Sequence, residues 1–333
     1  MPENSRAIGP LNWRALVDEA LRRRKAEKLT QREHAALASV SIPTIVAFDR
    51  GERTLSLAKA FDILRVVGLI EEAAEDGAQE AFVKDAFARW RALTAKLPAT
   101  SPARFPKGWY RFDYALEGDL RTPDLPEFQK IIEKSVVRHT GWPMFVSMTR
   151  PEFAPREVDG VIECWVKPLE SGVDRGLADP AHCDFWRAAP SGRFLLMRGY
   201  QEDGQDTVPA GTIFDTTLPI WRLAEALLHA TRVASHLRVG EGSDITVRFR
   251  ALYTGLSGRM LRSLRGQSYL LDTLPAKSDE ALLETVLSTS QIERALADAV
   301  YPLVVSLYER FGATHISPEF VSAEVERFRA GHF

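Results

Sequence analysis

The segment from residue 29 to residue 57 most constrains the fold, because its spacing predicts two short helices joined by a tight turn: LTQREHAALASVSIPTIVAFDRGERTLSL. Thr30 is placed to cap the first helix, since a threonine oxygen accepts a hydrogen bond from the free amides at a helix start. The apolar side of this helix carries Ala35 and Ala38. Leu37 ends it, a few residues before the next capping residue.

The second helix of the segment begins after Ser41, another residue that caps helices well. Pro43 falls in its first turn, where a missing N–H costs nothing. Ile45 and Phe48 lie three residues apart and form an inner face. Gly51 follows the helix and can take the left-handed conformation that often ends one. The segment is therefore a pair of capped helices meeting across a short turn.

The motif extends into matching flanks on both sides. Its residues are Leu29, Thr30, Gln31, Glu33, Ala35, Val40, Ser41, Thr44, Ile45, the run from Asp49 to Arg53, and Leu55; the flanks add Trp13, Leu16, Ala20, Leu21, Leu57, Ala60, Phe61, Leu64 and Val67. On these residues, positions 11–70 resemble the Cro and phage-repressor type of helix-turn-helix domain, the Xre-like group of bacteria. The resemblance implies an all-α N-terminal domain, residues 1–70, that binds double-stranded DNA at an operator.

The resemblance also implies roles for particular side chains. Gln31, at the start of the helix that Thr30 caps, would touch the phosphate backbone. The residues implied to face base edges or the nearby backbone are Ser41, Ile42, Pro43, Thr44, Val46 and Ala47. Arg32, Arg50 and Arg53 complete the expected DNA-binding set.

Three departures from the group's pattern carry consequences. His34 stands where the group usually buries a leucine, which predicts a partly buried histidine held by a hydrogen bond, with a pH switch as the alternative. Ser39 replaces the usual glycine of the turn, which predicts a less comfortable turn in the same fold. The reading face is apolar at Ile42, Pro43, Val46 and Ala47. The side chains that read adenine or guanine by paired hydrogen bonds are therefore missing from this helix.

An apolar reading face leaves recognition to thymine methyls, to DNA shape, and to Thr44, Gln31 and nearby arginines. The alternative is a degenerate domain that serves protein contacts.

Charge is distributed unevenly along the chain. The net charge is −2 over 333 residues, yet residues 1–70 hold 12 Lys+Arg against 8 Asp+Glu. The basic residues of this region include the run from Arg22 to Lys25, and Lys28. They are candidates for salt-sensitive attraction to phosphate. Alternatively, a basic run at the end of a first helix satisfies the helix dipole without nucleic acid.

Composition narrows the class of protein. A hydrophobic share of 45% with 26% charged residues is typical of a soluble protein long enough for two domains. No apolar run approaches eighteen residues and the start MPENSRAIGP lacks a signal-peptide core, so we expect a cytoplasmic, nucleoid-associated protein with no membrane partner. Cys164 and Cys183 are too few for a disulfide framework or a zinc cluster.

Residues 71–104 are expected to form an amphipathic connecting helix and a linker. The helix carries Phe82, Ala86, Trp90, Leu93 and Leu97 on one stripe. It either packs the first domain onto the rest of the chain or pairs with its copy in a second chain. The proline-rich stretch 98–107 predicts a domain boundary there.

Residues 105–333 show mixed helical and strand patterns, which predicts a larger α+β domain. We expect helices at 125–140, 218–237, 290–311 and 317–329. We expect strands at 144–148, 160–167, 193–200, 244–253 and near 279–287. No repeat and no low-complexity tract is present.

Three groups of residues in this domain are candidates for a ligand or anion site. Aromatic residues gather in its first half, either around a pocket or in the core. Charged residues recur along 218–237, as a solvated face or as a site for an anion or acidic partner. Arg248 and Arg250 lie on one side of a strand, as a phosphate site or as an exposed sheet face. The candidate residues are Trp142, Trp165, Trp186, Trp221, Arg222, His229, Arg248 and Arg250.

Marks of catalysis are weak. Residues 179–184, DPAHCD, gather a histidine, a thiol and two carboxylates, but adjacency in sequence is not the geometry that a nucleophile and a base require. The chain lacks GxxxxGK[ST], GxGxxG after a strand, HExxH and GxSxG. We therefore expect no catalytic residue, no metal and no cofactor.

Further motifs in residues 138–265 are RHTGWPMF, GVIECW, DPAHCDFWRA, FLLMRGYQEDG, TLPIWR and YTGLSGR. This region resembles the segment that follows Schlafen-AlbA-type DNA-binding modules in uncharacterised bacterial proteins. The resemblance implies a sensor or assembly domain that travels with different DNA-binding heads, and it brings no ligand or reaction.

These observations predict a DNA-binding transcription regulator, a repressor rather than an activator. Its C-terminal domain would form a homodimer and sense a small-molecule or protein effector. Two alternatives stay open. One is a defence- or DNA-damage-linked effector whose C-terminal domain binds nucleic acid or does chemistry. The other is an antitoxin-like protein that binds a partner.

Overall fold

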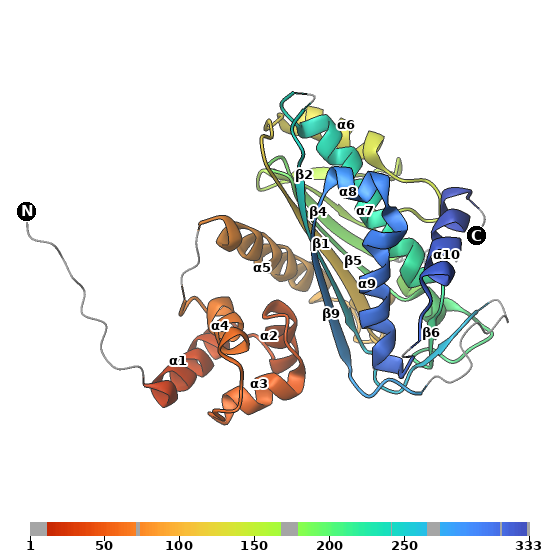
Figure 1. The fold of residues 1–333 in the computed structure, drawn as a ribbon. Helices are drawn as coiled ribbons and strands as arrows, with labels where there is room; N and C mark the ends of the chain where they lie inside the picture. Colours follow the sequence, from red (N-terminus) through yellow and green to blue (C-terminus); the bar gives the residue numbers. More distant parts are fainter. Residues whose placement is uncertain are drawn as a thin grey trace, which may run out of the picture. The chain divides into compact units, whose positions relative to one another are not determined.

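The chain divides into two compact units, Met1–Glu80 and Ala81–Phe333 (Figure 1). The computed structural model describes residues 12–70, 74–167, 179–240, 242–264, 274–313 and 315–331. The first unit is helical and the second combines a sheet with helices, as the sequence predicts. The division lies after Glu80, before the boundary expected near 98–107.

Unit 1 is a set of short helices, each begun by a polar side chain. They are α1 (Trp13–Ala26), α2 (Gln31–Leu37), α3 (Ile42–Asp49) and α4 (Leu57–Val66). Asn12, Thr30, Ser41 and Ser56 accept hydrogen bonds from first-turn amides of these helices. Glu33 returns a bond to the amide of Thr30 and completes a capping box. The predicted bounds of the paired helices are confirmed.

One face of each helix in unit 1 is buried in a shared core. Val17 of α1, Ile45 of α3 and Ile63 of α4 have no exposed surface. Trp13 packs edge to face against Phe48, with ring centroids 5.4 Å apart. The inner face predicted for the second helix of the motif is thereby confirmed.

His34 is fully buried in this core. Its Nε2 donates to the carbonyl oxygen of Ile63 at 3.0 Å, and its Nδ1 has no hydrogen-bond partner among the described residues. Burial lowers the pKa of His34 below its usual value. The predicted buried, hydrogen-bonded histidine is confirmed, and it is neutral at pH 7.

Replacing His34 with leucine is expected to flatten the pH dependence of unit 1 stability. The unfolded chain binds a proton near the ordinary histidine pKa, about 6.5. The folded chain binds it only at lower pH. Stability is therefore complete above about pH 6.5 and falls as the pH drops toward the lowered pKa. Amide hydrogen exchange of α2 and α4 at pH 7 and pH 5, corrected for intrinsic rates, measures this loss. Equal losses in the wild type and His34→Leu would contradict the assignment.

The turn between α2 and α3 contains a strained residue. Ser39 takes a left-handed conformation with φ of 55°, and its hydroxyl is buried without a hydrogen-bond partner among the described residues. A residue with a Cβ pays about 1–2 kcal/mol for this conformation, whereas glycine adopts it freely. The strained turn that the sequence predicts, with serine in place of glycine, is confirmed.

Ser39→Gly is expected to stabilise unit 1 by about 0.5–1 kcal/mol, after allowing for the greater freedom of glycine in the unfolded chain. Native-state hydrogen exchange of α2 and α3 in the full chain measures the gain. Ser39→Ala is the matched control, because it removes the hydroxyl but keeps the strained Cβ. If alanine stabilised as much as glycine, the backbone strain would not be the cause.

Unit 2 is built on a mainly antiparallel sheet. Its strands, within the described residues, are β1 (Trp109–Glu117), β2 (Arg156–Val158), β3 (Val161–Trp165), β4 (Asp184–Ala189), β5 (Arg193–Gly199), β7 (Thr246–Thr254) and β9 (Glu280–Ser288). Their order is β2-β3-β4-β5-β1-β7-β9, and every neighbouring pair is antiparallel. A separate parallel pair joins β6 (Ile213–Asp215) to β8 (Met260–Arg262).

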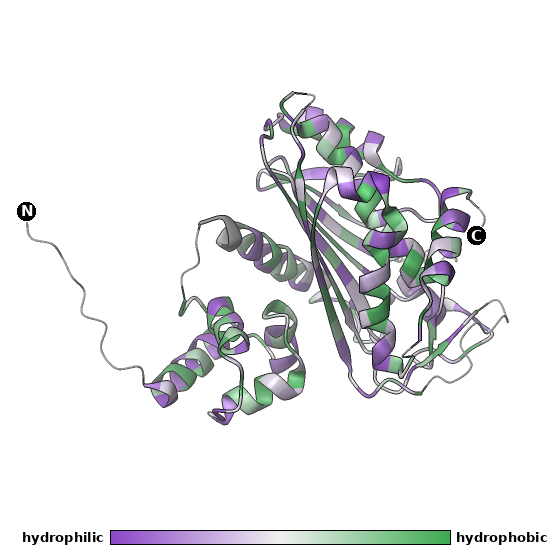
Figure 2. Cartoon of the chain, in the orientation of Figure 1, coloured by the Kyte–Doolittle hydropathy of each residue, from purple (hydrophilic) through white to green (hydrophobic). Residues whose placement is uncertain are grey.

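Helices lie on one face of this sheet (Figure 1). They are α6 (Leu125–Ser135), α7 (Leu218–Leu237), α8 (Thr289–Arg294), α9 (Leu296–Tyr308) and α10 (Pro318–Arg329). Tyr110, Phe112 and Tyr114 of β1 point into the core under them. The helices carry both hydrophilic and hydrophobic residues, as Figure 2 shows for α6 and α9. Helix α7 also carries both kinds of residue, but it is buried along most of its length.

The opposite face of the sheet meets helix α5 (Ala74–Thr94). Phe87 of α5 packs against Trp109, with ring centroids 6.0 Å apart, and Arg89 holds Glu163 of β3 through both carboxylate oxygens. The part of α5 from residue 81 onward therefore belongs to unit 2 rather than to a separate linker.

Several predicted elements are wrong in detail. Residues 144–148 form no strand, and Phe145 there has a positive φ of 53°. Helix α6 ends at Ser135 rather than residue 140, because the backbone turns extended at Val136. A break at Ala295 separates α8 from α9 within the helix predicted at 290–311. Strands β1 and β4 are additions that the sequence did not predict.

Candidate functional site

The outward side of α3 is the part of unit 1 that the sequence marks for DNA. Ile45 and Phe48 turn into the core, and the expected reading residues lie at or near the surface. Pro43 is exposed, while Ser41, Ile42, Thr44, Val46 and Ala47 are half-buried. The expected reading residues thus lie at the start of one short helix and along its exposed part, although Ile42 also packs against the core.

Two polar groups beside this face are bound within the protein. The hydroxyls of Ser41 and Thr44 lie 2.8 Å apart. The amide nitrogen of Gln31 donates to Asp49 at 2.7 Å. Asp49 in turn receives two hydrogen bonds from Arg24, both 2.8 Å long. Gln31 is exposed, yet its amide is engaged with Asp49 rather than standing free for a phosphate.

Three arginines of the basic run on α1 bind carboxylates of unit 1. Arg22 and Arg23 both bind Glu19, and their hydrogen bonds lower the pKa of Glu19 to about 2. Arg24 is buried against Asp49. These three arginines therefore make contacts within unit 1, and Arg24 is the one of them that is buried.

Two other arginines of the expected set remain exposed. Arg32 lies near the start of α2 and Arg53 follows α3, and neither has an ion pair among the described residues. Arg50 lies 3.8 Å from Glu52, which is a weak exposed contact. Arg32 and Arg53 are the cations that this region offers to a phosphate.

The tryptophans expected at a ligand site are dispersed in unit 2. Trp186 and Trp221 are core residues whose indole N–H groups donate to Val146 and Glu324. Trp165 is half-buried beneath the ammonium of Lys167. The aromatic cluster is therefore largely core, the second of the two readings left open.

The charged positions on α7 are buried, so the solvated face expected there is wrong for three of them. Arg222 binds Glu225 at 2.8 Å. The Nδ1 of His229 lies 2.8 Å from the hydroxyl of Tyr114, and burial lowers the pKa of His229 to about 3. His229 is consequently neutral at pH 7 and forms part of the core.

Arg248 and Arg250 are paired with carboxylates on the neighbouring strand. Arg248 binds Glu117 and Arg250 binds Asp113, which also binds Arg111. The sheet supplies its own anions to these arginines. Arg248 and Arg250 therefore do not form the pair of unengaged cations that the expected phosphate site requires.

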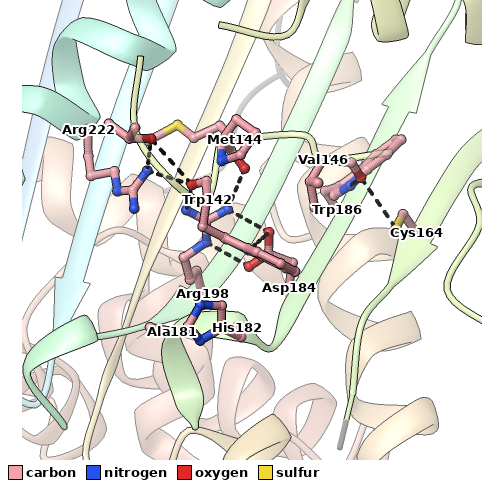
Figure 3. A network of polar contacts seen from close by, with 12 residues as sticks. Trp142, Met144, Val146, Cys164, Ala181, His182, Asp184, Trp186, Arg198 and Arg222 are labelled. Carbon is pink, nitrogen blue, oxygen red and sulfur yellow. Dashed lines mark hydrogen bonds and ion pairs between the residues drawn. The ribbon is translucent and has the colours of Figure 1, made fainter. Parts of the chain in front are cut away.

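The densest polar network of unit 2 surrounds a buried pair, Arg198 and Asp184 (Figure 3). The guanidinium donates to both carboxylate oxygens, at 2.6 and 2.5 Å. Trp142 adds its indole N–H to Asp184 at 3.2 Å, and its carbonyl oxygen accepts from Arg222 at 2.8 Å. The network thus links β4 and β5 to α7 through residues 140–143 (the 140s segment).

The DPAHCD segment does not assemble a nucleophile and a base. His182 binds Asp179 at 2.8 Å, while Asp184 faces Arg198. Cys183 is buried, and burial raises the pKa of its thiol well above the usual value. Burial raises the pKa of the Cys164 thiol in the same way. Neither sulfur is a thiolate at neutral pH.

A small pocket lies beside the Arg198 network. Its cavity volume is about 30 Å³, and it is bounded by β1, β5, β7 and the first turns of α7. Arg222 is its one lining residue among the expected ligand residues. Tyr110, Arg198, Glu202 and Tyr253 also line it. These residues are scattered over more than 140 positions, so no local sequence signal marks the pocket.

Comparisons with known proteins add no relative: no protein-family model, no curated protein and no solved structure matches this chain. Within the described residues, no group of three or more His, Cys, Asp or Glu side chains is placed to hold a metal ion. No helix among those residues is long and apolar enough to cross a membrane.

Asp184→Asn is expected to destabilise unit 2 by about 3–5 kcal/mol, because it leaves the buried charge of Arg198 without its counter-ion. Urea unfolding of the full chain measures the change. The matched control is Glu127→Gln, which breaks the exposed pair with Arg121. That control is expected to cost less than about 1 kcal/mol. Similar losses in the two variants would contradict the structural role given to the Asp184 pair.

Proposed function

We propose that this protein binds double-stranded DNA through α3 and acts as a transcription regulator. The observation that carries the proposal is the outward side of α3, a short capped helix set across a tight turn from α2. Such a pair is the arrangement in which the second helix enters the major groove with its N-terminal residues toward the bases. On that side Pro43 is exposed and Thr44, Val46 and Ala47 are half-buried, whereas Ile42 also packs against the core of unit 1.

The anchoring of α3 supports this role. The pair between Arg24 and Asp49 ties the end of α3 to α1, and Gln31 ties α2 to the same carboxylate. Trp13 donates to the carbonyl oxygen of Gly51 just beyond α3. A helix that reads DNA needs such support, because base contacts depend on its position within a fraction of an ångström.

The chemistry of the face limits how it would read a sequence. Ile42, Val46 and Ala47 offer methyl groups and no donors or acceptors, so thymine methyls are the base groups they suit. Thr44 supplies a hydroxyl, and Arg32 and Arg53 supply charge for the backbone. We infer modest direct readout supplemented by DNA shape.

The proposal extends to unit 2 as a sensing and dimerising domain. One such head contacts few base pairs, and two heads related by a dyad read half-sites about 34 Å apart. A signal bound by unit 2 would act by favouring one spacing of the heads, which requires different affinities for the two states.

Arg53→Ala is expected to weaken DNA binding on every sequence. Losing one phosphate contact lowers the slope of log K against log salt concentration by about 1. Fluorescence anisotropy with the full chain, using a duplex selected from a random pool, measures the slope. Arg22→Ala is the matched control, since it removes the same charge from an arginine already bound to Glu19. Identical slopes for wild type and Arg53→Ala, or a larger effect of Arg22→Ala, would contradict the proposed interface.

A further inference from the structure

The pocket in unit 2 holds polar groups that the protein itself does not satisfy. Tyr253 lines the pocket and is 2% exposed, and its hydroxyl has no hydrogen-bond partner among the described residues. A buried hydroxyl without a partner costs about 1–3 kcal/mol, and such groups are uncommon in folded proteins. The hydroxyl of Tyr253 therefore calls for a partner that the chain does not provide.

Arg222 presents unused donors to the same pocket. Its hydrogen bonds to the described residues are made by Nη1, which donates to Thr140, to the carbonyl oxygen of Trp142 and to Glu225. Its Nε and Nη2 have no partner among the described residues, although the residue is only 9% exposed. Guanidinium N–H groups donate and cannot accept. The unused edge therefore favours a ligand that bears acceptor oxygens.

The position of this edge is fixed in advance. The three bonds at Nη1, each 2.8 Å long, hold the guanidinium against α7 and the 140s segment. The neighbouring cation in the lining, Arg198, is already held by both oxygens of Asp184. A ligand would thus meet one prepared guanidinium edge at little cost in side-chain freedom.

Much of the rest of the lining is apolar. Phe112, Phe214, Leu218 and Pro219 form hydrophobic walls. The acidic residue of the lining, Glu202, directs Oε1 to the amide of Asp215 at 2.6 Å. A cavity of about 30 Å³ admits only a small molecule.

We propose that this pocket binds a small aliphatic monocarboxylate. Its two oxygens accept hydrogen bonds from the free edge of Arg222 and from the hydroxyl of Tyr253, and its short alkyl end lies against Phe214 and Leu218. An arginine edge suits a carboxylate because two parallel N–H groups match its two oxygens. This site goes beyond the proposed DNA-binding function and stands whether or not unit 1 binds DNA.

Calorimetric titration of the full-length protein tests the site, without DNA and at constant ionic strength. The probe is sodium propionate, with propionamide as its neutral counterpart. Propionate is expected to bind at least about tenfold more tightly, because only the carboxylate forms charge-assisted bonds with Arg222. Tyr253→Phe removes one hydroxyl that has no protein partner, so the variant should fold, and it is expected to bind propionate about tenfold more weakly.

The matched control is Tyr301→Phe, which removes a hydroxyl that donates to Ile316 away from the pocket. It is expected to bind propionate as the wild type does. Three results would overturn the proposal: no binding of propionate, equal binding of propionate and propionamide, or unchanged affinity in Tyr253→Phe. Retained propionate binding in a protein that fails to bind DNA would leave this site standing and refute only the proposed function.

Discussion

Both units depend on one kind of interaction, a guanidinium held by both oxygens of an aspartate in the interior. Arg24 and Asp49 form it in unit 1. In unit 2 it recurs between Arg198 and Asp184 and between Arg259 and Asp203. Such pairs add little net stability, but the loss of one partner leaves the other as an unpaired buried charge. We infer that they serve chiefly to fix how neighbouring elements meet.

Arg259 illustrates what such a pair organises. Besides Asp203, its guanidinium binds the carbonyl oxygens of Lys107, Ile213 and Gly255, and it lies 4.4 Å from the centre of the Tyr200 ring. The chain before β1 and the chain after β7 approach closely there. A Cβ at Gly255 would lie 2.4 Å from the carbonyl oxygen of Lys107. Glycine at this position is therefore a requirement of the approach.

Local signals in the sequence predicted the local structure well. The caps at Thr30 and Ser41 and the φ of Ser39 depend on residues close in the chain, so they follow from residue type and spacing. Strand β1 was missed because it is buried on both faces and includes Arg111 and Asp113. Buried charges of this kind do not fit the apolar pattern by which a buried strand is recognised. Arg111 pairs with Asp113, and Asp113 also binds Arg250 from a strand more than 130 residues away.

The difference between local and long-range contacts also explains which site residues could be predicted from the sequence. Sequence spacing correctly predicted that Ile45 and Phe48 of α3 turn into the core, because a helix repeats within a few residues. Spacing could not show that Arg24 forms an ion pair with Asp49. It also could not show that Arg222 and Tyr253 line one pocket, because tertiary folding brings these residues together. Aromatic content alone therefore did not distinguish a ligand pocket from the core in which Trp186 and Trp221 lie.

The central claim is that the outward side of α3 meets the bases of DNA. The most direct measurement is the sequence preference of the full chain, selected from a random duplex pool, for the wild type and for Ala47→Arg. A new arginine on that face is predicted to change the preferred bases, because it brings donors suited to guanine. The matched variant Ala58→Arg, at an exposed position of α4, is predicted to keep the wild-type preference. An unchanged preference in Ala47→Arg would contradict the claim.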